Sequence, residues 1–175
     1  MIEEVQEVNK VEVEVVEVED NIEFQLDQAD ITLYALLGSP SPGTMRVLGQ
    51  IRAHWVVILL DTGSSYSFLD FVLVRTLQLA MDTKRILEVR VADGDLIRTK
   101  GECKDLLITM RGKDFLVDLH VLTMGGCDVV LGTQWLSTLA LISWDFKQLE
   151  MEFTYQGIEW LQGIKSIGSI IQDRE

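Results

Sequence analysis

The feature that most constrains the fold is a succession of short apolar runs separated by turns. From Met45 onward, runs rich in β-branched and aromatic residues recur, and several of the turns between them contain glycine. The runs predicted to be strands cover residues 45–51, 55–60, 87–91, 96–99, 106–110, 115–122, 141–144 and 149–155. Because no helix repeats between them, we expect a mainly β fold, either a closed barrel or two packed antiparallel sheets.

Two short helices are predicted within this pattern. The first covers about Leu69–Leu79, where apolar residues recur at helical spacing and Ser67 is placed to cap the N-terminus. The second is a helical turn at about Gln134–Leu139. Both are too short to form a layer of their own, so the strands define the fold.

The 175 residues suffice for one domain with extensions at its ends. From Ile2 to Asp20 the chain is almost entirely Glu and Val; the alternation would suit a one-sided strand, but the density of like charge favours a disordered tail. We therefore predict an acidic tail over residues 1–30, a folded domain over 31–156 and a C-terminal extension over 157–175. Residues 31–36 are interpreted as a first short strand or an ordered lead-in.

Charge and composition exclude several classes of function. The formal net charge of −13 argues against direct nucleic-acid binding, because that affinity depends on Lys and Arg neutralising phosphates. No segment resembles a signal peptide or is long and apolar enough to span a membrane, so we expect an intracellular, cytoplasmic protein. The two cysteines and two histidines lie in no metal-binding pattern, so reduced thiols and no metal or cofactor are expected.

One strand ends in a group of residues that could carry chemistry. The apolar run Trp55–Leu60 leads into Asp61, Thr62, Gly63 and Ser64. Two such carboxylates facing each other in a water-poor cleft would share one proton, so that one could activate water as a base and the other could act as an acid. Gly63 would permit a tight turn, Thr62 could brace the loop by hydrogen bonding, and Ser64 could donate to the outer carboxylate oxygen. The same residue types are common in ordinary turns, which is the alternative reading of this motif.

The context of this motif makes it more specific. About seventy residues later a second apolar strand, 127–131, leads into Gly132. The whole pattern resembles the protease segment of gypsy-class LTR retrotransposon polyproteins, a branch of the retropepsins, across about residues 31–156. The matching segments are 39–47, 57–65, 68–70, 89–94, 101–103, 125–132, 134–136 and 144–146.

This resemblance implies a closed β-barrel acid protease with one or two short helices that acts as a homodimer. It implies that Asp61 is the catalytic aspartate of each subunit, that Thr62 and Gly63 support its loop, and that the hairpin turning at Asp93 and Gly94 is a flap over the bound peptide. The strand that ends at Gly132 is expected to pack under the active-site loop.

The implied activity is that of an aspartic endopeptidase on a peptide or polyprotein substrate, without a cofactor. Residues 132–134, Gly-Thr-Gln, differ from the Gly-Arg-Asp or Gly-Arg-Asn of many retropepsins, so the charged contacts that support those dimers do not carry over. The alternative is a non-catalytic dimerisation or peptide-binding module with the same fold.

Overall fold

The protein is described by a computed structural model that covers residues 23–32, 35–36, 44–145, 147–148 and 150–165. Twelve strands and two short helices are assigned within these ranges. The strands are β1 (Glu23–Ile31), β2 (Thr44–Ile51), β3 (His54–Asp61), β4 (Phe68–Asp70), β5 (Arg85–Val91), β6 (Leu96–Arg98), β7 (Glu102–Met110), β8 (Lys113–Leu122), β9 (Val129–Leu131), β10 (Ile142–Asp145), β11 (Glu150–Tyr155) and β12 (Ile158–Lys165). The helices are α2 (Phe71–Thr76) and α3 (Thr133–Leu136). The prediction of a mainly β fold is confirmed.

Six strands close into a barrel in the order β2-β3-β9-β4-β8-β7. Of the two architectures left open by the sequence, the closed barrel is therefore the correct one. The expectation of purely antiparallel pairing was wrong, because β3 pairs in parallel with β9, and β4 pairs in parallel with β8. These pairs join strands far apart in the chain, which a reading of local hairpins does not detect.

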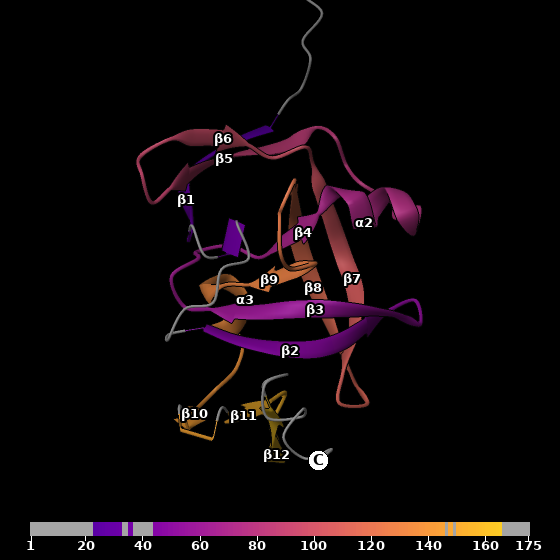
Figure 1. Cartoon of the computed structure of the whole chain (residues 1–175), viewed down its shortest axis with the longest axis vertical. Coiled ribbons are helices and arrows are strands. Elements are labelled where there is room, and N and C mark those ends of the chain that lie inside the picture. Colours follow the sequence, from indigo (N-terminus) through magenta and orange to yellow (C-terminus); the bar gives the residue numbers. More distant parts are fainter. Residues whose placement is uncertain (1–22, 33–34, 37–43, 146, 149, 166–175) are drawn as a thin grey trace, which may run out of the picture.

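Two three-stranded sheets flank the barrel at opposite ends of the molecule (Figure 1). One has the order β1-β5-β6, with β1 parallel to β5 and β6 antiparallel to it. The other has the order β10-β11-β12 and is antiparallel throughout. The barrel thus separates two sheets that make no backbone pairs with each other.

The buried apolar residues form two clusters. The first, which we call the barrel core, fills the barrel and includes Ile58, Leu60, Leu69, Ile108 and Phe115. The second, the outer cluster, lies on the opposite face of the same barrel strands; it contains Ala29, Ile31, Ala35, Leu59, Phe68, Leu87, Val89, Val91, Leu122, Met124, Cys127 and Val130. Side chains alternate along a strand, so β3 directs Leu60 inward and Leu59 outward. The apolar run that ends at Asp61 is continuous because β3 is buried on both faces.

The first predicted helix differs from α2 in its start and its cap. Phe68–Asp70 forms β4, and the helix begins after Asp70, which occupies the N-cap position without a side-chain cap bond. Ser67 does not cap it, because the Ser67 hydroxyl accepts a hydrogen bond from the Gly132 amide at 3.2 Å. The hydroxyl therefore joins two loops that are distant in sequence.

The N-terminal part of the described chain also differs from expectation. The structure has a strand over Glu23–Ile31, most of which lies inside the predicted acidic tail, and this strand ends where a first strand was expected to begin. Residues 1–22 of the predicted acidic tail lie outside the described residues. Among the described residues, no helix has the length and apolar character needed to cross a membrane.

Candidate active site

Asp61 is the last residue of β3 and is almost completely buried, with 2% of its surface exposed. Its strand is held on both sides, because Leu60 pairs with Met45 of β2 and with Leu131 of β9. A carboxylate at the end of such a strand is fixed in position by the barrel. Its location is therefore determined by the most extensively paired part of the fold.

Three hydrogen-bond donors surround the Asp61 carboxylate. The Gly63 amide donates to Oδ1 at 2.9 Å, and the Ser64 hydroxyl donates to Oδ2 at 2.8 Å. The third donor is the Thr32 hydroxyl, which lies 2.5 Å from Oδ2. Burying a carboxylate is costly unless its oxygens are hydrogen-bonded, and these three contacts meet that requirement while fixing the orientation of the group.

The loop after Asp61 differs in one respect from the sequence interpretation. Thr62 was expected to brace it, but the Thr62 side chain is exposed and its hydroxyl has no hydrogen-bond partner among the described residues. Gly63 is needed for close approach: a Cβ atom on it would lie 2.5 Å from the Thr32 Cγ2 atom and 3.3 Å from Asp61 Oδ1. The bracing hydroxyls are those of Thr32 and Ser64.

Thr32 is a site residue that sequence reasoning missed. It directly follows β1 and lies 29 positions before Asp61. Its backbone amide donates to the Ser64 hydroxyl at 3.2 Å, and its own hydroxyl accepts from the Ala35 amide at 3.1 Å. A single threonine in the mostly apolar stretch 31–36 gives no local signal of such a contact, because the contact depends on how β1 docks.

The strand β9 packs under the active-site loop, as predicted. The Thr133 and Gln134 amides donate to the Ser64 and Ser65 carbonyls at 2.8 and 2.9 Å. A Cβ atom on Gly132 would lie only 2.2 Å from the Tyr66 carbonyl oxygen, so the two backbones approach as closely as glycine allows. The loop that follows Asp61 is thus supported by residues 132–134, about seventy positions further along the chain.

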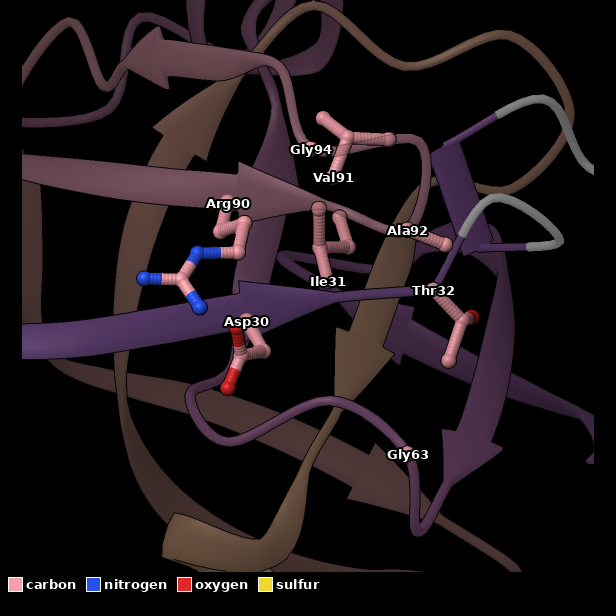
Figure 2. Close-up of a pocket in the computed structure, with 8 residues that line it drawn as sticks. All are labelled: Asp30, Ile31, Thr32, Gly63, Arg90, Val91, Ala92 and Gly94. Carbon is pink, nitrogen blue, oxygen red and sulfur yellow. The ribbon is translucent and has the colours of Figure 1, made fainter.

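A hairpin lies over the opposite side of the site. β5 and β6 are joined through a turn at Asp93 and Gly94, in which Gly94 has a φ of +96° and its amide donates to the Val91 carbonyl at 2.8 Å. A cavity of about 390 Å³ separates this turn from the Asp61 loop. Figure 2 shows the residues that line it: Asp30, Ile31, Thr32, Gly63, Arg90, Val91, Ala92 and Gly94.

The remaining reactive side chains do not contribute a nucleophile or a metal centre to this site. Cys103 and Cys127 are free and buried, and burial raises the pKa of each thiol to about 11, so both stay protonated at neutral pH. The described ranges contain no group of three or more His, Cys, Asp or Glu side chains placed to hold a metal ion. Asp61 and its donors are the chemically distinctive group next to the cavity.

Comparison with known proteins agrees with this fold. The crystal structure of the retroviral protease-like domain of Ddi1 from Leishmania major matches with a TM-score of 0.52 and 14% sequence identity, over 72% of this chain and 95% of that one. At this identity the match establishes the fold alone, which is retropepsin-like. No curated protein sequence matches the chain significantly. The family model described as "Retroviral aspartyl protease" matches residues 41–154, which is more than half of the sequence, so the chain belongs to the retroviral aspartyl protease family.

Proposed function

We propose that the protein is an aspartic endopeptidase that hydrolyses peptide bonds with two Asp61 carboxylates, one from each subunit of a homodimer. The observation that carries the proposal is the buried Asp61 carboxylate, held by the Gly63 amide and the Ser64 hydroxyl at the edge of a cavity. One copy of the chain supplies one such carboxylate at the site. A second copy would supply the other member of the pair.

The proposed mechanism follows from the repulsion of like charges. Two carboxylates in a water-poor cleft do not both ionise, so the pair holds one proton. The ionised member takes a proton from water as the water attacks the scissile carbonyl carbon, and the protonated member donates to the carbonyl oxygen. Gly63 and Ser64 keep the carboxylate oriented for this exchange.

The exposed position of Thr62 supports dimerisation through this loop. Its side chain has no intrachain partner among the described residues and lies next to Asp61 in the chain, so its hydroxyl is available to a second copy. The hairpin that turns at Asp93 and Gly94 is proposed to act as the flap, because it covers the cavity from the side opposite Gly63.

The origin and natural task are proposed from the sequence resemblance. The segments shared with gypsy-class retrotransposon proteases suggest descent from such an element and cleavage of a polyprotein. Two buried free thiols suit a reducing compartment, which supports an intracellular and cytoplasmic location.

The test is cleavage of a mixed peptide library at mildly acidic pH by the full chain and by Asp61→Asn. We expect cleavage by the wild type and a loss of at least about 10³-fold in the variant, since removing one member of a catalytic unit usually costs that much or more. Sedimentation across concentration should show that activity follows the dimer fraction. Equal cleavage by both proteins would exclude the aspartic mechanism, and a dimer that cleaves nothing would favour a binding module.

A further inference from the structure

The outer cluster lies between the β5-β6 hairpin and the barrel, and part of it comes from the N-terminal segment of the same chain. We propose that β1 and Thr32 are an internal occupant of the peptide-binding cleft, and that the chain must release this segment before it can bind a substrate. The proposal deepens the proposed function, on which it rests for the identity of the cleft.

On the hairpin side, the backbone of β1 pairs with β5. β1 pairs in parallel with β5, and Ala29, Asp30 and Ile31 lie opposite Val89, Arg90 and Val91. β6 pairs with the other edge of β5. Both edges of β5 are therefore satisfied within the chain, and an incoming extended peptide has no edge of β5 to pair with while β1 is in place.

On the Asp61 side, the same segment is hydrogen-bonded to the active-site loop. The Asp30 amide donates to the Ser65 hydroxyl at 2.6 Å, and the Ser65 amide donates to the Asp30 carbonyl at 2.9 Å. The Thr32 amide then reaches the Ser64 hydroxyl. The segment is thus held between the hairpin and the active-site loop, which is how an extended peptide would be held for reaction at Asp61.

The apolar side chains of β1 pack toward the barrel. Ala29 and Ile31 alternate along β1 toward the barrel and are 0% and 2% exposed. They belong to one buried apolar cluster with Leu59, Phe68 and Val130, which are the outward-facing residues of three barrel strands. Small and β-branched side chains at alternate positions of an extended chain therefore fill the apolar wall of the cleft.

Thr32 also contacts the proposed catalytic carboxylate of Asp61. The Thr32 hydroxyl donates to Asp61 Oδ2, the same oxygen that Ser64 contacts, and the Thr32 methyl group lies against Gly63. This contact places a hydroxyl of the chain where a bound water or substrate oxygen would meet the carboxylate. After Thr32 the chain leaves the extended course, since the Leu36 amide donates to the Thr32 carbonyl at 3.1 Å.

The position of the segment in the sequence supports a removable role. β1 and Thr32 precede residues 41–154, the region that the family model matches. The barrel closes without β1, whose strand pairing is with β5. Among residues 29–31, the part of this strand whose side chains the structure describes, Ala29 and Ile31 enter the outer cluster. Release would therefore leave the barrel core intact.

The bound segment acts as a competitor that is tethered to its site. Tethering gives an effective concentration in the millimolar range, so even a weakly bound segment keeps the cleft filled most of the time. The apparent dissociation constant for a free peptide is the intrinsic dissociation constant divided by the fraction of molecules with an open cleft, so binding is weaker when the cleft is mostly filled. The substrates that compete best should be extended chains with small or β-branched apolar residues at alternate positions.

The test is a disulfide lock in the full chain. Asp30 and Arg90 are exposed partners across the β1 and β5 pairing, so Asp30→Cys with Arg90→Cys should tie the segment to the hairpin when oxidised. The matched control is Glu88→Cys with Arg98→Cys, which joins β5 to β6 and leaves β1 free. The probe is a fluorescent synthetic peptide of residues 25–32, and the readouts are its binding by anisotropy and the cleavage of library peptides.

We expect oxidation of the Asp30 and Arg90 cysteine pair to weaken peptide binding by at least about 10-fold, with recovery on reduction. Oxidation of the control pair should change peptide binding by less than about 2-fold.

Ile31→Asp serves as a second variant, because a buried charge disfavours docking of β1. This variant should bind the peptide at least about 10-fold more tightly than the wild type. Equal binding in both redox states, or an unchanged affinity of Ile31→Asp, would overturn the proposal. A disulfide between two chains would overturn it as well, because β1 would then fill the partner's cleft.

Failure of the proposed function gives a different result. If redox-dependent peptide binding is found but no form cleaves any peptide, the internal occupant is supported and the peptidase is excluded. If the oxidised and reduced forms cleave equally fast, the peptidase stands and the internal occupant is excluded.

Discussion

The barrel core and the outer cluster use the same strands but depend on different parts of the chain. Each barrel strand contributes to the first cluster from one face and several contribute to the second from the other. The barrel core is enclosed by six strands that close on themselves, whereas the outer cluster is closed by β1, an edge strand paired on one side only. Residues of the two clusters are equally buried but have different roles: the barrel core stabilises the fold, and the outer cluster fills a cleft.

The sharpest test of this difference compares two buried isoleucines. Ile108 on β7 is 0% exposed in the barrel core, and Ile31 on β1 is 2% exposed in the outer cluster. We expect Ile108→Ala to lower the free energy of unfolding by about 2–5 kcal/mol, which is usual for such a truncation in a closed core. Ile31→Ala should cost less than about 2 kcal/mol, because detachment of β1 limits the loss.

Urea denaturation and native-state hydrogen exchange measure the two effects. Ile108→Ala should weaken protection throughout the barrel strands, whereas Ile31→Ala should weaken it mainly in β1 and along β5. Equal losses in the two variants, with the same pattern of exchange, would mean that the outer cluster is as integral to the fold as the barrel core.

A pH titration tests a histidine that is buried beside the outer cluster. His120 of β8 is buried against the rings of Tyr66 and Phe68, with centroid distances of 5.3 and 6.4 Å. Burial lowers the pKa of His120 to about 4; Asp118 opposes this shift and Arg85 adds to it. The unfolded chain, with an ordinary histidine pKa near 6.5, then binds more protons than the folded chain between about pH 6.5 and 4.

Stability should therefore fall as the pH falls through this window. We expect a loss on the order of 2 kcal/mol between pH 7.5 and pH 5 from this group alone. The unfolding free energy of His120→Gln should lack this part of the dependence on pH. The control is His54→Gln, which changes the other, exposed histidine and should retain the full dependence. A wild-type slope that survives in His120→Gln would assign the pH dependence to other groups.

The parts of the site that could be read from the sequence are those built by local patterns. The apolar run before Asp61, the turn at Gly63 and the hairpin at Gly94 each leave a signal within ten residues. Thr32 leaves none, because its contact with Asp61 arises from the parallel pairing of β1 with β5, more than fifty residues away. The N-cap assigned to Ser67 failed for the same reason, since its hydroxyl meets Gly132, which follows the neighbouring strand β9 but lies 65 positions further along the chain. Non-local pairing is what a reading of periodicity omits.

The smallest expected effect comes from one hydroxyl group at the contact between β1 and the proposed catalytic carboxylate. Thr32→Val keeps the shape of the side chain and removes its hydrogen bonds to Asp61 and from Ala35. A hydrogen bond of this kind contributes about 1 kcal/mol, so the open cleft should become roughly 5-fold more populated. We expect a correspondingly faster cleavage of peptides at concentrations below saturation, while the free energy of global unfolding changes little.

The matched control removes the same chemistry outside the cleft. The Thr109 hydroxyl of β7 donates to Asp114 Oδ1 at 2.6 Å, so Thr109→Val also deletes a threonine-to-aspartate hydrogen bond. It should leave the cleavage rate unchanged, because nothing in the cleft depends on it. If both variants altered cleavage equally, or if Thr32→Val slowed it, then Thr32 would support Asp61 in the reactive form of the protein, and release of β1 would not be the step that opens the cleft.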